Sequence, residues 1–184
     1  MNHFLYGVAR AVAESFDLPS PILEIGSYKV AGQEEIADLR PLFPGKDYVG
    51  IDTRPGPGVD QVADVEALSF AKSTFGTVIA MSTFEHVPRF WRGFEEIHRV
   101  LRPDGVLFVC CPFYFHIHAY PSDYWRFTPE AFEVLLPSVT TVVAHHFRRV
   151  LLGVAQEHLE AVGHETEIAA ANAAASRRLE TQWG

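Results

Sequence analysis

The chain has 184 residues, 48% of them hydrophobic and 21% charged, a balance typical of a single globular domain and not of a disordered or fibrous protein. Its formal net charge of −8 argues against a nucleic-acid partner, because proteins that bind DNA or RNA usually present a basic face to the phosphates. No segment approaches the ~20 apolar residues that a membrane span requires, so no membrane partner is expected.

The N-terminal segment 1–20 is expected to be helical and to cover a sheet. It carries Arg10 and Glu14 and lacks the long apolar run of a signal peptide. The only two cysteines, Cys110 and Cys111, are neighbours in an apolar run, so a strand would point them to opposite faces. They form no zinc or redox motif, which suits a reducing compartment, and we expect a cytoplasmic protein.

Short apolar runs alternate with helical patterns along the chain, which is typical of βαβ units and a mainly parallel sheet. We expect seven strands, at 22–25, 48–51, 59–63, 77–81, 106–110, 140–145 and 150–155. Helices are expected at 33–42, 88–101 and 129–136, the last with Thr128 as N-cap. A turn is expected at Arg102-Pro103-Asp104-Gly105. The prediction is a single-domain α/β protein, Rossmann-like with helices on both faces, comprising a main domain at 21–155 and a helical tail at 156–184.

The first strand is followed by a glycine turn, Gly26-Ser27, that opens toward a helix. Glycine there permits an unusual φ and the close approach of a ligand to the backbone. The dinucleotide fingerprint GxGxxG is absent, because Tyr28 and Val30 stand where further glycines would be expected. Taken alone, Gly26 is equally well explained as the turn of any βα unit.

Carboxylates end the next two strands. Asp52 lies 26 residues after Gly26, where an acidic group can accept hydrogen bonds from both ribose hydroxyls of an adenosine ligand. Asp64 follows the third strand, where it can accept from the adenine amino group. Either residue, taken singly, is also explained as an Asx-turn or a helix cap. The agreement of three successive strand ends favours a nucleotide pocket.

The fourth strand ends in a polar cluster that contains Ser82, Glu85 and His86. A histidine beside a glutamate can accept a proton or orient a substrate. The alternative is that Glu85 and His86 cap the helix that follows.

The chain resembles the class I S-adenosylmethionine-dependent methyltransferases, and among them the methyltransferase type 11 group, in four ordered segments: Leu23-Glu24-Ile25-Gly26-Ser27, Tyr48-Val49-Gly50-Ile51-Asp52, Phe84-Glu85-His86-Val87 and Leu101-Arg102-Pro103-Asp104-Gly105. The resemblance covers about residues 20–136 and implies an S-adenosylmethionine cofactor. By this resemblance an acceptor nucleophile attacks the methyl group of the cofactor's sulfonium directly, and the thioether is the leaving group. It implies that Glu24, Gly26 and Ser27 surround the methionine and ribose of the cofactor and that Asp52 holds the ribose hydroxyls. It also implies that Asp64 and Val65 contact the adenine and that Ser82 borders the methionine carboxylate. The glycine turn departs from the family pattern at Tyr28 and Val30, so it must take a different path.

The segment 112–127 has no clean period and is dense in aromatic residues and histidines, as expected for a loop that leaves the carboxyl end of a strand. With the end of the fourth strand it supplies the candidate catalytic residues His86, His116, His118 and Asp123, and the candidate substrate-binding residues Glu85, Tyr120, Tyr124, Trp125 and Arg126. A metal site made of His116, His118 and Asp123 is conceivable, but satisfied hydrogen bonds or substrate contacts are preferred and no metal is expected. Tyr124 and Trp125 are equally well explained as core residues.

We expect a small-molecule or biosynthetic-intermediate acceptor, and a homodimer is one way to close the site of so short a chain. One alternative is a non-catalytic module that binds S-adenosylmethionine or S-adenosylhomocysteine. The other is a nicotinamide-dependent oxidoreductase, which fits less well because GxGxxG and a YxxxK pair are both missing.

Overall fold

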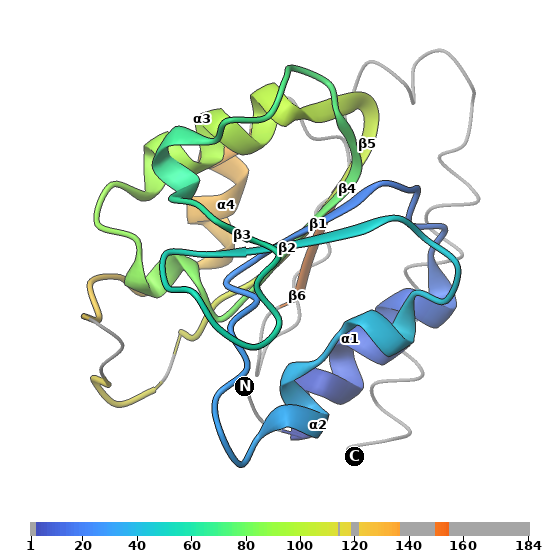
Figure 1. The fold of residues 1–184 in the computed structure, drawn as a ribbon. Coiled ribbons are helices and arrows are strands. Elements are labelled where there is room, and N and C mark those ends of the chain that lie inside the picture. Colours follow the sequence, from blue (N-terminus) through green and yellow to red (C-terminus); the bar gives the residue numbers. More distant parts are fainter. Residues whose placement is uncertain (1–2, 114, 119–121, 137–149, 155–184) are drawn as a thin grey trace.

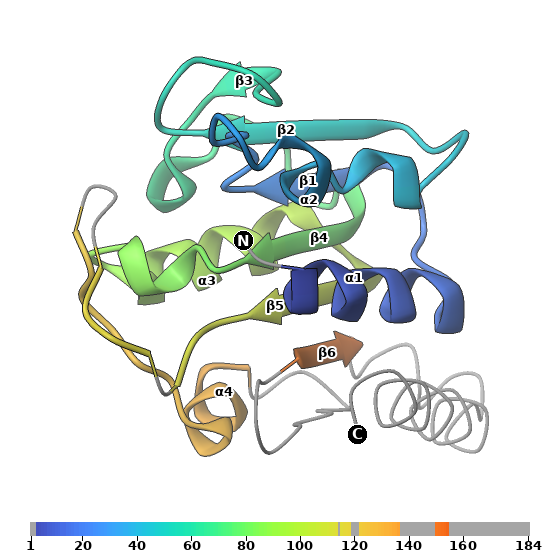
Figure 2. The same cartoon turned by 90° about the horizontal axis from the view of Figure 1, so that it is seen from below.

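The computed structural model of the chain describes residues 3–113, 115–118, 122–136 and 150–154. Its described strands form one sheet in the order β3-β2-β1-β4-β5-β6 (Figures 1 and 2). β1 to β5 are parallel to their neighbours, and β6 runs antiparallel to β5. The strands span Ile22–Ile25 (β1), Tyr48–Asp52 (β2), Gln61–Val62 (β3), Phe75–Met81 (β4), Leu101–Cys110 (β5) and Val150–Val154 (β6).

Helices cover both faces of this sheet, with α1 and α2 on one side and α3 and α4 on the other (Figure 1). The α-helices span His3–Ser15 (α1), Glu34–Ala37 (α2), Phe90–Val100 (α3) and Pro129–Leu135 (α4). Three short 3₁₀ helices span Arg40–Leu42 (η1), Val65–Ala67 (η2) and Phe84–His86 (η3). The predicted Rossmann-like α/β architecture is therefore confirmed.

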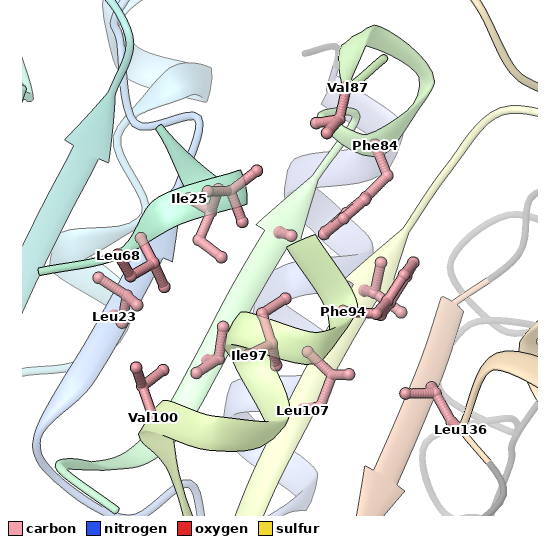
Figure 3. Packing of buried hydrophobic residues seen from close by; sticks show 14 of the residues in the cluster. Leu23, Ile25, Leu68, Phe84, Val87, Phe94, Ile97, Val100, Leu107 and Leu136 are labelled. Carbon is pink, nitrogen blue, oxygen red and sulfur yellow. The ribbon is translucent and has the colours of Figure 1, made fainter. Parts of the chain in front are cut away.

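The central strands are apolar because both of their faces are buried. All seven residues of β4 and all four of β1 are buried. Successive side chains of a strand alternate between two cores, so Leu23 packs on the α3 side while Ile22 packs on the α1 side. Figure 3 shows the first of these cores, in which Phe94, Ile97 and Val100 of α3 lie against the sheet.

Two local expectations about helices met different outcomes. The predicted helix at 33–42 is wrong as a single element: α2 ends at Ala37, Asp38 is extended, and η1 begins at Arg40. Pro41 accounts for the break, since a proline cannot donate a helical hydrogen bond to the carbonyl four residues before it and its ring clashes with that carbonyl, here that of Ala37. Thr128 is confirmed as the N-cap of α4, because its Oγ1 accepts from the Ala131 amide at 3.2 Å.

The turn expected at 102–105 lies inside β5 as a register shift. Leu101 pairs with Phe75 and Val106 with Thr77, so the intervening residues leave the regular ladder. The structure describes six strands where seven were expected; the strand at 140–145, residue 155 and the tail at 156–184 lie outside the described residues. Among the described helices, none has the length and apolar character needed to cross a membrane.

The order of the strands reverses its direction between β1 and β4, which is the topological switch point of the sheet. The chain proceeds from β1 outward to β3 in one direction and then returns to β4 on the other side of β1. In open α/β sheets, ligands bind outside the carboxyl ends of the strands at this point, because the flanking loops diverge there and leave a crevice.

Candidate active site

A cavity of about 760 Å³ opens at this switch point. It is lined from the carboxyl ends of four strands, by Gly26 after β1, Asp52 at the end of β2, Ser82 after β4 and Cys111 after β5. Its volume falls in the range of roughly 300–1,000 Å³ that small-molecule sites usually occupy.

Most of the site residues predicted from the sequence line this cavity: Glu24, Gly26, Asp52, Asp64, Val65, Ser82, Glu85, His86, His116, His118 and Tyr124. Four others lie outside its lining: Ser27, Asp123, Trp125 and Arg126. The remaining candidate, Tyr120, falls outside the described residues. The structure therefore brings the two predicted halves, the strand ends and the 112–127 loop, to one cavity.

The turn at Gly26 is fixed by backbone contacts on both sides. Its φ is +81°, a value that glycine tolerates and other residues rarely adopt. The amides of Gly26 and Ser27 both donate to the Ile51 carbonyl, at 2.8 and 3.0 Å. A Cβ at Gly26 would collide with Oγ1 of Thr83, which itself donates to the Ile25 carbonyl at 3.0 Å. Glycine is required here by the approach of the β4 end as well as by φ.

Tyr28 gives this turn an aromatic wall in place of a glycine-rich loop. Its ring lies against Gly56, where a Cβ would collide with it, and the Arg54 guanidinium lies 4.4 Å from the ring centroid. Both Tyr28 and Arg54 line the cavity. The departure from the family pattern thus has a structural counterpart, since Gly56 provides the space that Tyr28 fills.

Ser27 points away from the cavity. Its side chain is buried, its Oγ has no hydrogen-bond partner among the described residues, and a Cβ on Gly50 would lie only 2.7 Å from that oxygen. Ser27 therefore packs between the β1 turn and β2, and the absence of a side chain at Gly50 makes this possible.

The two strand-end aspartates line the cavity and also shape their own turns. Asp52 Oδ1 accepts from the Arg54 amide at 3.0 Å, and Asp64 Oδ1 accepts from the Glu66 amide at 2.9 Å as the N-cap of η2. Asp52 therefore forms an Asx-turn and Asp64 a helix cap, as the alternatives from the sequence expected, and both residues also line the cavity. The local bonds fix the orientation of each carboxylate.

Glu24 is a buried carboxylate with a partner that the sequence did not reveal. Tyr48 donates its hydroxyl to Glu24 Oε2 at 3.0 Å, and Arg40 lies 5.1 Å from the Tyr48 ring centroid. Burial raises the pKa of Glu24 to about 7, although the bond from Tyr48 opposes this shift. The parallel register pairs Glu24 with Gly50, which makes Tyr48 its diagonal neighbour on the same face.

Glu85 and His86 lie on η3, which begins two residues after Ser82, a left-handed residue with a φ of +51°. The Glu85 side chain is fully buried, and neither of its oxygens has a hydrogen-bond partner among the described residues. Burial raises the pKa of Glu85 to about 7. The cap alternative is wrong for both residues, because α3 has Arg89 at its N-cap position and no side-chain cap.

His86 is fixed by the loop that follows β5. Its Nδ1 lies 2.7 Å from the Ser122 carbonyl, which can only accept, so Nδ1 donates and Nε2 carries the lone pair. Nε2 lies 3.9 Å from Glu85 Oε1, and burial lowers the pKa of the ring. The Glu85 carbonyl in turn accepts from the Tyr124 amide at 2.8 Å, so η3 and the loop are joined at two points.

Asp123 is the centre of an ion-paired cluster behind the cavity. It accepts from the His118 amide at 2.9 Å and lies 2.9 Å from His118 Nδ1. Both terminal nitrogens of Arg126 donate to it, at 2.5 and 2.7 Å, and Arg126 holds its pKa well below the usual range. Arg126 also donates to the carbonyls of Phe115 and His116. Asp123 and Arg126 therefore position His118.

The two aromatic candidates of the loop differ. Trp125 donates its Nε1 to the carbonyls of Val87 and Pro88, at 3.1 and 3.2 Å, and its ring lies 5.0 Å from that of Phe90. It packs against the α3 core, as the core interpretation expected. Tyr124 is half exposed and lines the cavity, as does the exposed His116.

A protein-family model matches part of the chain. Residues 23–109 match a family model described as a methyltransferase domain. The matched segment is just under half of the chain and includes the Gly26 turn, Asp52, η3 and α3. No curated protein matches the sequence.

Solved structures of low sequence identity share the fold. The 1,6-didemethyltoxoflavin-N1-methyltransferase of Burkholderia thailandensis, solved with 1,6-didemethyltoxoflavin and S-adenosylhomocysteine, superposes with a TM-score of 0.64 at 17% identity, over 83% of this chain and 78% of its own. A SAM-dependent methyltransferase from Aquifex aeolicus gives 0.58 at 15% identity, over 83% and 90%. A chain from the complex with the Haloferax volcanii Trm112 methyltransferase activator gives 0.62 at 16% identity, over 82% and 89%. At these identities the likeness shows the fold alone.

Proposed function

We propose that the chain is an S-adenosylmethionine-dependent methyltransferase that transfers a methyl group to a small-molecule acceptor or a biosynthetic intermediate. The proposal is supported by the match of residues 23–109 to the model of a methyltransferase domain. The observation that carries the proposal is that one cavity is lined both by the strand-end acids Asp52 and Asp64 and by Glu85, His86 and His118. The first group fits the nucleoside of the cofactor, and the second fits an acceptor that must lose a proton.

The donor half of the cavity has the chemistry that the cofactor requires. Gly26 lines the cavity and has no side chain, so a ligand can approach the backbone at this residue. In this proposal Asp52 accepts from the ribose hydroxyls, Asp64 and Val65 face the adenine, and Ser82 borders the methionine carboxylate. Glu24 lies buried at the same wall, where a cationic group of the ligand would favour its charged form.

The acceptor half supplies a proton acceptor and a positioned wall. When bound, S-adenosylmethionine would supply a methyl group on a positively charged sulfur. The acceptor nucleophile would bond to this methyl carbon as the carbon–sulfur bond breaks, and S-adenosylhomocysteine would be the leaving group. The Nε2 lone pair of His86 can accept a hydrogen bond from the acceptor hydroxyl or amine and take up its proton. Tyr124 and His116 offer an exposed aromatic face against which the acceptor can lie. Much of the rate enhancement then comes from holding donor and acceptor in line.

Calorimetric titration with S-adenosylhomocysteine tests the donor half. We expect the unmodified protein to bind, and Asp52→Ala to weaken binding by about 100-fold, because it removes a carboxylate that accepts from two hydroxyls. Asp104→Ala, at an exposed site in the β5 register shift, is the matched control and should bind normally. A parallel titration with NADH addresses the oxidoreductase alternative. If the unmodified protein binds NADH and not S-adenosylhomocysteine, the proposal is wrong.

A methyl-release assay over a panel of acceptors, including sugars and phenols, tests the acceptor half. The proposed enzyme transfers the methyl group to at least one of them. Tight binding of the cofactor with no transfer to any acceptor would instead support a non-catalytic binding module.

We also propose a cytoplasmic location. Its support is that the only two cysteines, Cys110 and Cys111, are free buried thiols, as is usual in reducing compartments.

A further inference from the structure

Three side chains on the acceptor side of the cavity form a group with the chemistry of metal ligands. Glu85, His86 and His118 each offer one ligand atom, and these atoms all lie within 4.8 Å of one another. In the part of the chain that the structure describes, no other group of three or more such residues comes together. Two come from η3 and the third from the loop after β5, so the fold assembles the group from separate segments.

Glu85 points to a bound cation. Its side chain has no exposed surface, yet both oxygens lack a hydrogen-bond partner among the described residues. A buried carboxyl group without partners loses its hydration and gains nothing in return, so it must either hold a proton or face a positive charge. No arginine or lysine pairs with it among the described ion pairs, whereas two imidazoles face it.

The two imidazoles are oriented as metal-binding histidines usually are. Nδ1 of His86 donates to the Ser122 carbonyl, and Nδ1 of His118 lies 2.9 Å from the Asp123 carboxylate. Each ring therefore keeps its lone pair on Nε2, and the ring centroids lie 4.8 Å apart. A carbonyl or carboxylate behind each histidine fixes the tautomer and makes the ring a better ligand.

We propose that Glu85, His86 and His118 bind one divalent first-row transition-metal ion, with Ser122 and Asp123 holding the two imidazoles in place. Two imidazoles and a carboxylate suit ions such as zinc, iron or cobalt, whereas magnesium and calcium prefer oxygen ligands throughout. Three protein ligands leave positions open on the ion, as in catalytic sites.

The distances allow this with small movements. Ligand atoms around a tetrahedral ion at ordinary bond lengths lie about 3.3 Å apart, so the widest pair must close by about 1.5 Å. Side-chain torsions of Glu85 and His118 can supply this closure. This set of ligands differs from the metal site of His116, His118 and Asp123 that was considered from the sequence. In the structure His116 is exposed, and Asp123 is already paired with Arg126.

A metal here would also specify the acceptor, a consequence that rests on the proposed methyl transfer. An oxygen of the acceptor bound to the ion loses its proton more easily, because the positive charge stabilises the anion. With the ion bound, the Nε2 lone pair of His86 would coordinate the ion and would no longer accept the proton of the acceptor. The ion would instead promote loss of that proton to solvent. The substrates favoured are those with a hydroxyl or phenol that can reach the ion, and not simple amines.

The test is a titration of the full chain, without a histidine tag and after treatment with a chelator, with Co²⁺ and Zn²⁺. Binding is followed by calorimetry and by the visible absorption of Co²⁺. We expect one ion per chain, and loss of at least about 100-fold in affinity in Glu85→Gln and His118→Ala, each of which removes a ligand. Asp123→Asn should weaken binding by about 10-fold to 100-fold.

Controls make the result specific to this site. Glu95→Gln and His98→Ala change the same residue types at exposed positions of α3 and should bind metal as the unmodified chain does. A cooperative thermal unfolding transition, followed by circular dichroism, shows that each variant is folded. If no stoichiometric binding occurs, or if Glu85→Gln and His118→Ala leave it unchanged, the metal site is wrong. Since this titration uses neither cofactor nor acceptor, its failure is distinct from failure of the proposed function.

Discussion

The two halves of the cavity are built in different ways. On the donor side, Gly26, Asp52 and Asp64 are held by bonds to their own or adjacent strand ends, and each carboxylate already has a local amide partner. On the acceptor side, Glu85 has no hydrogen-bond partner among the described residues, and His118 depends on Asp123 and Arg126 in the same loop. The donor side is thus fixed by backbone geometry, and the acceptor side by a network of side chains.

This difference determines which substitutions should affect which half. A change that alters the backbone path at a strand end should damage cofactor binding and folding together. A change within the loop network should spare both and reduce only methyl transfer. Four substitutions test this separation, in order of decreasing effect.

Gly26→Ala should be the most damaging, because the new Cβ adds a collision with Thr83 to the cost of a left-handed φ. We expect a loss of at least about 3 kcal/mol in the free energy of unfolding, measured with denaturant, and loss of S-adenosylhomocysteine binding. Gly32→Ala is the matched control, since Gly32 has a φ of +79° but open space around it. It should cost about 1 kcal/mol. Equal losses in both variants would show that the close approach at Gly26 is unimportant.

Arg126→Gln should separate the two halves most clearly. It removes the charge that holds Asp123 and the donors to the Phe115 and His116 carbonyls. We expect methyl transfer to fall by about 100-fold in kcat/KM, because a catalytic group displaced by about 1 Å loses this much. Binding of S-adenosylhomocysteine should stay within about twofold of the unmodified value. A matching loss of cofactor binding would contradict the separation.

Glu24→Gln should change the pH dependence of stability on the donor side. The folded-state pKa of Glu24, about 7, is above its ordinary value of 4.5, so its stabilising contribution is full below pH 4.5 and is lost as pH rises through 7. Glutamine keeps an acceptor for Tyr48 but does not ionise. The variant should therefore gain about 3 kcal/mol relative to the unmodified chain between these pH values, measured by denaturant unfolding across pH. A pH-independent difference would contradict the assigned cause.

Trp125→Phe should be the mildest of the four changes. It retains an aromatic ring against Phe90 but removes the N–H that bonds to the Val87 and Pro88 carbonyls. We expect a loss of about 1 kcal/mol in the free energy of unfolding, with little change in cofactor binding. A loss of cofactor binding without destabilisation would show that Trp125 acts in the site and not in the core.

The sequence was most informative where local pattern determines structure. Apolar runs located the strands, and acids after strands located one part of the cavity wall, because the carboxyl ends of parallel strands meet at one edge. The helix expected at 33–42 failed because its apolar pattern continues through Pro41, which the backbone cannot accommodate.

Contacts between distant segments were beyond prediction. Tyr48 reaches Glu24 only because of the register between β1 and β2, and Ser27 turns inward because Gly50 leaves space. The 112–127 loop was located, yet its association with Glu85 depends on bonds between residues more than 30 apart, such as Tyr124 to Glu85. Because of these bonds, the side chains that come together as potential metal ligands are Glu85, His86 and His118. The set considered from the sequence was His116, His118 and Asp123.

A crystal structure of the chain with S-adenosylhomocysteine would show whether one cavity joins a nucleoside site to an acceptor site. We predict that the ribose hydroxyls bond to Asp52 and that the sulfur faces the cluster of Glu85, His86 and His118. A ligand bound elsewhere, or one whose sulfur faces away from this cluster, would contradict the proposed arrangement.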